Sequence, residues 1–329
     1  MHSTGSGSLR VSALIMLLLA AAVPVAAQQF AGAPAITARL ATPATQGLLT
    51  VSARVDEVNL LFTVTDRKGH FVTDLAESDF QVLDDHKPPD SIRLFQQQSD
   101  LPLRVGLLID LSTSITDRFD FEKKAAATFL KKTVRAQTDQ AFVLGFNQKL
   151  HLVQDATGNP KELTSAVQKL KAGGSTSLYD AIVYACRKLQ SGPHDQLVRK
   201  VLIVITDGAD TTSRSSLGDA EQAAAKAETA IFALSTNELH DGEYPKGEAV
   251  LDLLTRYAGG QILRAREAHQ LAKAFAQVEN ALRSQYVIAY KPADFRPDGN
   301  FRPIELKPVR EKLHIQCRRG YFAPRENPD

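Results

Sequence analysis

Apolar runs alternate with amphipathic stretches between residues 103 and 284. The runs predict strands over Leu103–Ile109, Ala141–Phe146, Leu150–Val153, Val201–Ile205, Ala230–Leu234 and Gln261–Leu263. The stretches predict helices over Phe121–Val134, Lys161–Leu170, Leu178–Leu189, Asp219–Thr229, Ala249–Tyr257 and Ala268–Arg283. Short apolar strands separated by such helices are typical of a mainly parallel sheet covered on both faces. The step from Phe146 to Leu150 is too short for a crossover helix, so one edge strand is predicted to be antiparallel.

The segments on either side of this α/β pattern alternate with a period of two. Before it, strands are predicted over Val58–Val64, Phe80–Leu83 and Ile92–Phe95, and after it over Gln285–Tyr290, Phe301–Leu306 and Leu313–Cys317. Each flank is too short to build a core of its own. We therefore expect residues 50–98 and 285–323 to form one small β-sandwich, with the α/β domain of residues 101–284 inserted and residues 324–329 as a tail. Two separate small sheets, or strands that extend the main sheet, are the alternatives.

The N-terminal residues have the pattern of a secretory signal peptide. The positively charged Arg10 precedes an apolar stretch from Val11 to Val23, and the small residues of Val25–Ala27 form a cleavage site. Cleavage there makes residues 1–27 the signal peptide, and the Ala-, Thr- and Pro-rich residues 28–49 a flexible linker. The alternative is an uncleaved membrane anchor, but the apolar stretch is short for a membrane span. We expect an exported protein, periplasmic or secreted, with no membrane span after cleavage.

Composition bears on nucleic acid as a partner and on the state of the cysteines. The net charge is +2 and no arginine-rich stripe occurs, so nothing supports binding of nucleic acid. The two cysteines, Cys186 and Cys317, lie on an apolar helical face and in a predicted strand. We interpret them as small buried apolar residues, while a single disulfide between them is the alternative in an oxidising compartment.

Three loops carry the polar residues that point to chemistry. The first is Asp110-Leu111-Ser112-Thr113-Ser114 after a predicted strand, the second is Gly173–Thr176 before a predicted helix, and the third is Thr206–Asp210 after another strand. Taken singly, such residues are most often helix caps and turns. Together, they offer hydroxyl and carboxylate oxygens at the edge where an α/β sheet binds ligands. Hard oxygen donors suit Mg²⁺, Mn²⁺ or Ca²⁺ rather than zinc.

With these three loops in this order, the chain resembles the von Willebrand factor type A family. The resemblance covers residues 101–284 and implies a Rossmann-like fold with a metal-ion-dependent adhesion site. The metal ligands that it implies are Asp110, Ser112, Ser114, Thr176 and Asp207. Asp210 and Thr211 lie close by and are candidates for contributions through water. The whole chain also resembles exported bacterial proteins with a related type A domain.

The resemblance implies a binding mechanism rather than a reaction. Two carboxylates and three hydroxyls leave a divalent ion incompletely neutralised, which favours an acidic ligand. In the family, a partner protein supplies that ligand as an Asp or Glu. We therefore expect Mg²⁺ as cofactor, with Mn²⁺ or Ca²⁺ as alternatives, and an adhesion-type protein partner. In related type A domains the last helix moves when the metal ligand changes. Here the last predicted helix, Ala268–Arg283, runs directly into Gln285–Tyr290, so we hypothesise from this connectivity that its movement reorients the two domains.

Two other functions were weighed. In a scaffold, the metal would only hold the three loops together and stabilise the fold. In a haloacid-dehalogenase-like phosphatase, Asp110 would be the nucleophile, but Ser112 stands where that chemistry needs a second aspartate. No glycine-rich nucleotide loop follows the first strand, no zinc-type histidine cluster occurs, and no Gly-x-Ser-x-Gly elbow is present. We therefore expect no enzyme.

Overall fold

The computed structural model describes residues 56–191, 197–237, 246–265 and 267–325. The predicted signal peptide, the predicted linker and most of the predicted tail lie outside these ranges. In the described residues, no helix combines the length and the apolar character needed to cross a membrane.

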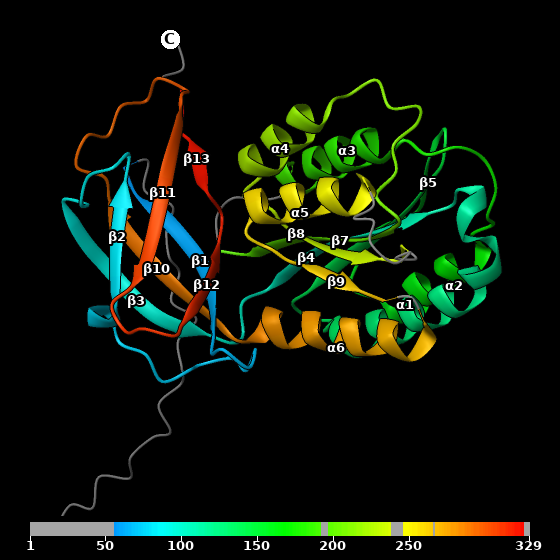
Figure 1. Ribbon diagram of the computed structural model, residues 1–329, viewed down its shortest axis with the longest axis horizontal. Helices are drawn as coiled ribbons and strands as arrows, with labels where there is room; N and C mark the ends of the chain where they lie inside the picture. The colour runs from blue at the N-terminus through cyan, green and yellow to red at the C-terminus, as the bar shows by residue number, and fades with distance from the viewer. Residues whose placement is uncertain (1–55, 192–196, 238–245, 266, 326–329) are drawn as a thin grey trace, which may run out of the picture. The chain divides into compact units, whose positions relative to one another are not determined.

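A six-stranded sheet forms the centre of the α/β region, in the order β6-β5-β4-β7-β8-β9 (Figure 1). Its strands are β4 (Leu103–Asp110), β5 (Gln140–Phe146), β6 (Leu150–Thr157), β7 (Arg199–Thr206), β8 (Ala230–Ser235) and β9 (Ile262–Arg264). All neighbours are parallel except β5 and β6, which pair antiparallel at the edge. The predicted α/β fold with one antiparallel edge strand is therefore confirmed.

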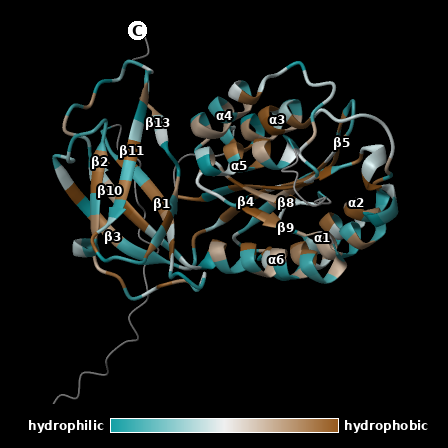
Figure 2. Ribbon diagram, viewed as in Figure 1, coloured by the Kyte–Doolittle hydropathy of each residue, from teal (hydrophilic) through white to brown (hydrophobic). Residues whose placement is uncertain are grey.

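Helices cover both faces of this sheet. They are α1 (Phe119–Thr133), α2 (Pro160–Lys169), α3 (Leu178–Gln190), α4 (Leu217–Lys226), α5 (Lys246–Ala258) and α6 (Ala268–Arg283). Alternate residues of each central strand face opposite sides, so Leu107 packs with α1, α2 and α6 while Leu108 packs with α3, α4 and α5. The strands are apolar on both faces, as their colour in Figure 2 shows, because helices bury them from both sides.

The boundaries differ from the predicted ones where local polar contacts decide them. A 3₁₀-helix, η2 (Thr113–Arg118), precedes α1, and the sequence pattern did not indicate it. Helix α4 begins earlier than predicted because Ser216 and Asp219 form a capping box at its N-terminus. It ends earlier because Glu228 adopts a positive φ of 52° just beyond it.

The two flanks pair with each other in two further sheets. One has the order β12-β1-β10-β3 and the other β13-β11-β2. The strands are β1 (Val58–Thr65), β2 (Phe80–Asp84) and β3 (Ser91–Gln98) from the N-terminal flank, and β10 (Gln285–Lys291), β11 (Phe301–Pro308), β12 (His314–Cys317) and β13 (Gly320–Phe322) from the C-terminal flank. A short 3₁₀-helix, η1 (Glu77–Asp79), leads into β2. Side chains from both flanks share one core, which confirms the predicted β-sandwich.

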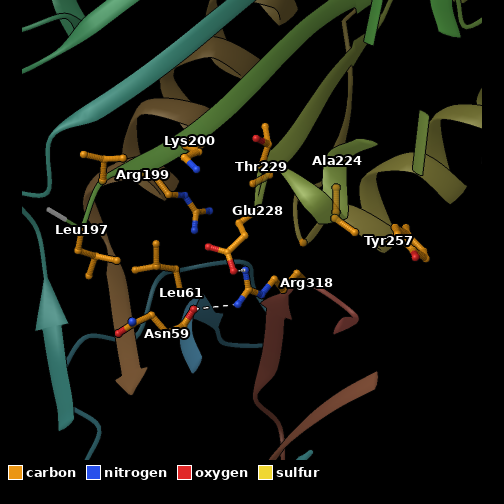
Figure 3. Close-up of a pocket in the computed structure, with 15 residues that line it drawn as sticks. Asn59, Leu61, Leu197, Arg199, Lys200, Ala224, Glu228, Thr229, Tyr257 and Arg318 are labelled. Carbon is orange, nitrogen blue, oxygen red and sulfur yellow. Dashed lines mark hydrogen bonds and ion pairs between the residues drawn. The ribbon is translucent and has the colours of Figure 1, made fainter. Parts of the chain in front are cut away.

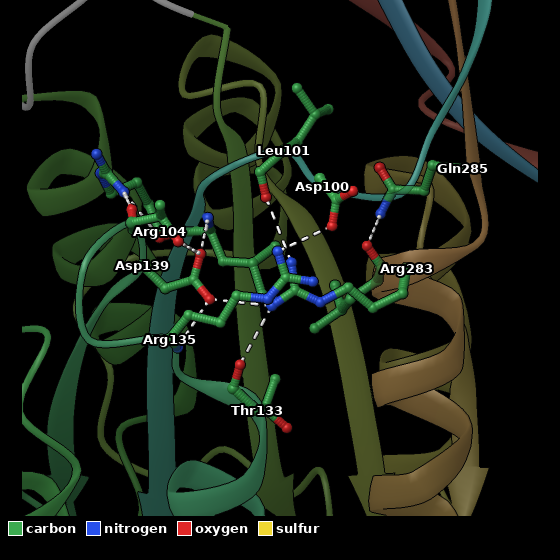
Figure 4. A network of polar contacts seen from close by, with 11 residues as sticks. Asp100, Leu101, Arg104, Thr133, Arg135, Asp139, Arg283 and Gln285 are labelled. Atoms are coloured by element: carbon green, nitrogen blue, oxygen red, sulfur yellow. Dashed lines mark hydrogen bonds and ion pairs between the residues drawn. The ribbon is translucent and has the colours of Figure 1, made fainter. Parts of the chain in front are cut away.

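A polar network holds the two ends of the α/β region together (Figure 4). The Arg283 guanidinium at the end of α6 donates to Asp139 Oδ2 at 3.0 Å and to the Thr133 carbonyl at 3.2 Å. Asp139 is buried and also accepts from the Leu103 amide at 2.8 Å, at the start of β4. The C-terminal end of α6 therefore lies beside the N-terminal end of β4.

Both cysteines are free thiols, so the alternative of a disulfide is excluded by the structure. Cys186 is buried in α3 and Cys317 is half-buried at the end of β12. Burial raises the pKa of the Cys186 thiol to about 12 and that of Cys317 to about 11, which makes both unreactive at neutral pH.

Candidate metal centre

The candidate site lies at the carboxyl end of β4 and β7. Asp110 is the last residue of β4, and Asp207 directly follows β7. Because the two strands are parallel neighbours, their carboxyl ends meet at one edge of the sheet. This register brings Asp110 and Asp207 together. Thr206, the residue before Asp207, is 96 positions from Asp110 in the sequence, and their side chains are hydrogen-bonded.

A row of hydrogen bonds links four of the predicted ligands. The Ser112 amide donates to Asp110 Oδ1 at 2.8 Å, and the hydroxyls of Ser112 and Ser114 lie 2.9 Å apart. Ser114 Oγ then donates to Asp207 Oδ2 at 2.9 Å. Two carboxylates and two hydroxyls thus converge from two loops that are far apart in the sequence.

Thr176 lies on the second loop, which is bonded to both of the others. On one side, the Thr113 amide donates to the Gly174 carbonyl at 3.0 Å. On the other, Thr211 Oγ1 accepts from the Thr176 amide at 3.0 Å and donates to its carbonyl at 3.2 Å. Thr176 is buried, and no hydrogen bond from its side chain to the four linked residues is found among the described residues. The loop is held in place through backbone contacts.

Two glycines shape this second loop. Gly173 and Gly174 have φ values of 141° and 109°, which only glycine adopts without strain. Asn147 Nδ2 donates to the Gly173 carbonyl at 2.8 Å and so fixes the loop to the end of β5. The glycines therefore let the chain turn close against the first loop.

Asp210 and Thr211 have different positions. Asp210 Oδ1 accepts from the Tyr179 amide at 3.3 Å and from Ser213 Oγ at 2.6 Å, so it holds the start of α3. Thr211 contacts Thr176 directly and positions its backbone. Of these two residues, Thr211 is the one bonded to a predicted ligand.

Burial is graded across the site. The Asp110 side chain is fully buried, Asp207 is half-buried and Ser114 is exposed. Asp110 is buried although it lies at the end of β4, and Thr206 Oγ1 donates to its Oδ2 at 2.7 Å. Access to the site is therefore from the side of Ser114 and Asp207.

The electrostatics of the site fit a cation. Burial raises the pKa of the Asp110 carboxyl to about 6, against the lowering hydrogen bonds from Thr206 and Ser112, and the charge of Asp207 raises it further. Two carboxylates in one hydrogen-bonded row repel each other, and a nearby positive charge relieves that repulsion. No group of three or more His, Cys, Asp or Glu side chains that could hold a metal occurs in the described part of the chain.

Sequence reasoning missed two residues beside the site. Thr206 precedes Asp207, and its side chain is hydrogen-bonded to Asp110. A hydroxyl residue at the end of a predicted strand, next to a predicted ligand, was the feature of the sequence that could have indicated it. Glu122 lies on the buried face of α1 with Phe119 and Ala126, and a charged residue at that spacing was also visible. The charges of Asp110 and Asp207 raise the pKa of Glu122, although burial is the larger cause.

Comparison with known proteins gives one family. Residues 105–209 match the von Willebrand factor type A domain, a range that spans the first and second loops and most of the third. No curated protein matches the chain.

Solved structures similar to the chain come from several bacteria. The PilB minor pilin from Streptococcus sanguinis has 14% identity and a TM-score of 0.47, over 60% of this chain and 63% of that one. An aerotolerance-related membrane protein from Bacteroides fragilis has 16% identity and a TM-score of 0.44, over 54% of this chain and 98% of that one. A von Willebrand factor type A protein from Catenulispora acidiphila has 13% identity and a TM-score of 0.48, over 81% and 72%. The chain thus spans less than two thirds of the pilin.

Proposed function

Because the chain contains a von Willebrand factor type A domain, we propose that the protein is an exported module that binds an acidic residue of a partner protein through a divalent cation. The match to this domain family supports a protein-interaction function. The ion in the proposal is Mg²⁺, with Mn²⁺ or Ca²⁺ as alternatives, and its ligands are Asp110, Ser112, Ser114, Thr176 and Asp207.

One observation carries this proposal, the hydrogen-bonded row from Asp110 through Ser112 and Ser114 to Asp207. The oxygens of Ser112, Ser114 and Asp207 lie within hydrogen-bond distance of their neighbours, and the Ser112 amide holds the Asp110 carboxylate beside them. Such hard oxygen donors suit one small cation. Mg²⁺ prefers such oxygen ligands and retains waters at its other positions.

The graded burial gives the direction from which a partner would approach. Asp110 is fully buried, so an acidic side chain of a partner cannot reach the ion from its side. Ser114 is exposed and Asp207 is half-buried, so the open coordination position faces them. A partner carboxylate entering there would replace a water and complete the neutralisation of the ion.

The proposal contains no reaction. Ser112 occupies the position where a phosphatase of the haloacid-dehalogenase type needs its proton-carrying aspartate, and its hydroxyl is bonded to Ser114. Export is proposed from the sequence of residues 1–27, which lie outside the described residues.

Affinity capture tests the proposal. The purified protein, immobilised with Mg²⁺, should retain a partner from an extracellular or periplasmic fraction, and a chelator should release it. Ser114→Ala and Asp207→Asn should lose retention, because each removes a ligand on the accessible side. Asp117→Asn is the matched control, since Asp117 is an exposed carboxylate in η2 outside the row. Retention that is equal with Mg²⁺ and with chelator would contradict metal bridging.

The second candidate function is a scaffold whose ion only stabilises the loops. The contacts of Thr113 with Gly174 and of Thr211 with Thr176 favour it, because the three loops are already tied together without a partner. A protein that melts earlier in chelator, yet retains no acidic partner in any fraction, would support the scaffold and contradict adhesion.

A further inference from the structure

A small pocket rich in positive charge lies away from the candidate metal centre (Figure 3). It forms between β1, the start of β7, the turn after α4 and the residue that follows β12. Its charged lining residues are Arg199, Lys200, Glu228 and Arg318, which are three cations and one carboxylate. Because Arg199 begins β7 and Asp207 follows the end of that strand, the pocket and the candidate metal centre lie at opposite ends of β7.

Arg199 is the most unusual of these residues. Its side chain is only 6% exposed, and its Nε has no hydrogen-bond partner among the described residues. No ion pair of its guanidinium is found in the described residues either, and Figure 3 shows the group directed toward Glu228 and Arg318. A buried guanidinium nitrogen without an acceptor is unfavourable, and an anion in the pocket would supply that acceptor.

Glu228, the carboxylate among the described residues that line the pocket, is already engaged. Glu228 Oε1 pairs with Arg318 Nη1 at 2.6 Å, and Arg318 Nη2 donates to the Asn59 carbonyl at 3.1 Å. Arg318 Nε, like Arg199 Nε, is buried without a partner. Glu228 therefore neutralises one of the three cations, and two positive charges remain together with two unpaired guanidinium donors.

Burial shifts the pKa of both Arg199 and Lys200. Burial, together with the nearby charge of Arg318, lowers the pKa of Arg199 to about 10. Burial also lowers the pKa of Lys200, while the charge of Glu228 raises it. The charge of a bound anion would oppose both shifts, because it favours the protonated forms.

We propose that this pocket binds a small, doubly charged oxyanion, either phosphate or sulfate. Among the described lining residues, the two cations that Glu228 does not neutralise match its charge, and guanidinium groups are suited to oxyanions. The cavity volume is about 40 Å³. At the 10–15 Å³ that one water needs, this is room for about three or four oxygen-sized atoms. The anion would join β1 and the β12 end of the sandwich to β7 of the α/β region.

Calorimetric titration tests this inference. Sodium phosphate and sodium sulfate are titrated separately into the purified protein in the presence of a chelator, which keeps the metal centre out of the measurement. Sodium chloride at matched ionic strength is the reference. We expect saturable binding of one oxyanion per chain and none of chloride, and the two titrations distinguish phosphate from sulfate as the preferred ligand.

Three variants assign the binding to the pocket. Lys200→Met should weaken binding about tenfold or more, since it removes one cation near the anion. Glu228→Gln should tighten it several-fold, because it removes the competing carboxylate of the described pocket lining. Lys131→Ala is the control, an exposed lysine on α1, and should change nothing. Arg199→Met should abolish binding, with thermal unfolding measured in parallel to establish that the variant folds.

The opposite sign expected for Glu228→Gln separates specific binding from a general effect of charge or stability. Absence of saturable binding, or equal weakening in Lys200→Met and Lys131→Ala, would overturn the proposal. So would a crystal structure in phosphate or sulfate in which the anion lies elsewhere. None of these results depends on the metal centre, so the proposed function stands or fails separately.

Discussion

Asp110 is the residue on which the candidate metal centre depends. Its carboxylate accepts from the Ser112 amide and from the Thr206 hydroxyl, and it is fully buried. It thus combines a structural role in joining β4 to β7 with the proposed role of metal ligand. A substitution that removes the whole carboxylate tests both roles together, whereas an isosteric one tests the charge.

Asp110→Asn should therefore abolish the thermal stabilisation by Mg²⁺ while leaving the fold intact. The amide retains the shape of the side chain but loses the charge that holds a cation. Stabilisation of the parent protein should reach about 2.7 kcal/mol at a Mg²⁺ concentration of 100 times Kd. Asp110→Ala should show the same loss and a lower stability, by about 1–3 kcal/mol, because two donors lose their acceptor. Undiminished Mg²⁺ stabilisation in both variants, measured by melting temperature, would contradict the ligand set.

Glu122 makes the stability of the metal-free protein depend on pH. Its carboxylate oxygens are buried without a hydrogen-bond partner in the described structure, and Arg118 Nε lies 3.6 Å away. Burial raises the pKa of Glu122 from 4.5 to about 8. Below pH 4.5 both the folded and the unfolded chain hold the proton, so no penalty exists. Between 4.5 and about 8 only the unfolded chain releases it, and stability falls as pH rises.

Glu122→Gln should remove this loss. The variant is expected to be more stable than the parent protein at pH 8 by on the order of 5 kcal/mol, because the pKa shift from 4.5 to about 8 corresponds to about 1.4 kcal/mol for each unit. Denaturant unfolding between pH 5 and 8 in chelator measures the difference. Glu311→Gln, at an exposed glutamate, is the control and should leave the slope with pH unchanged. An identical slope in parent and Glu122→Gln would show that the buried carboxyl is not protonated in this range.

The third loop and helix α5 approach each other backbone to backbone. Gly208 has a φ of 80°, and a Cβ there would lie 2.5 Å from the Gly247 carbonyl oxygen. A Cβ on Gly247 would lie 2.2 Å from the Asp207 carbonyl oxygen. The start of α5 thus supports the backbone of Asp207 directly, and two glycines make this contact possible.

Gly208→Ala should accordingly weaken Mg²⁺ stabilisation although it changes no ligand, because the new methyl group displaces the loop that carries Asp207. Gly69→Ala is a close control, since Gly69 has a φ of 82° with nothing within 4 Å of a Cβ. Both variants should lose about 1–3 kcal/mol of stability from the backbone strain. Only Gly208→Ala should reduce the Mg²⁺-induced rise in melting temperature. Equal Mg²⁺ responses would mean that α5 does not position Asp207.

The network around Asp139 fixes the end of α6. Asp139→Asn should destabilise the protein by about 3–5 kcal/mol, because it leaves the guanidinium of Arg283 without its buried partner. Arg135→Ala removes an exposed pair with Asp100 in the same network and should cost less than about 1 kcal/mol. Denaturant unfolding of both variants checks the contrast. Similar small losses would indicate that α6 is not held at this end, which would favour the family-derived hypothesis that this helix moves.

The elements buried on both faces were predictable from the sequence, while the exposed ones were not. Strands β4 and β8 were each predicted to within one residue because a continuous apolar run marks them. Strand β6 extends to Thr157, four residues beyond the predicted end, because its partly exposed residues show no apolar pattern. The oxygen-bearing residues of the metal-site loops could also be identified from the sequence. Their hydrogen bonds, such as Thr206 to Asp110, depend on which strands are neighbours, and the sequence pattern does not determine that.

In the whole molecule, the inserted domain brings the two flanks together. Gln98 ends β3 and Gln285 begins β10, and these residues are paired across the two strands. The folded α/β region therefore closes the long loop between the flanks and lowers the entropic cost of pairing them. The sandwich core draws on both flanks, since Leu60 and Val82 pack with Ile288 and Ile304.

Neither flank should fold alone. A fragment of residues 50–98 lacks β10, which pairs with both β1 and β3, and should be unstructured by circular dichroism. The complete chain should show the β signal of the sandwich and lose it together with the α/β region on heating. A stable, folded fragment 50–98 would contradict the shared core.

The pairing of Gln98 with Gln285 also has a mechanical consequence. A load applied at the metal centre would leave the α/β region through two connections, which enter β3 and β10 side by side from the same end. Both strands would then be pulled in the same direction, so the hydrogen bonds between them carry no shear. For a chain held at the start of β1, the tension passes instead to the bonds of β10 with β1, which run as an antiparallel ladder from Val58 to Phe62. This ladder is where the protein would yield under traction on a bound partner.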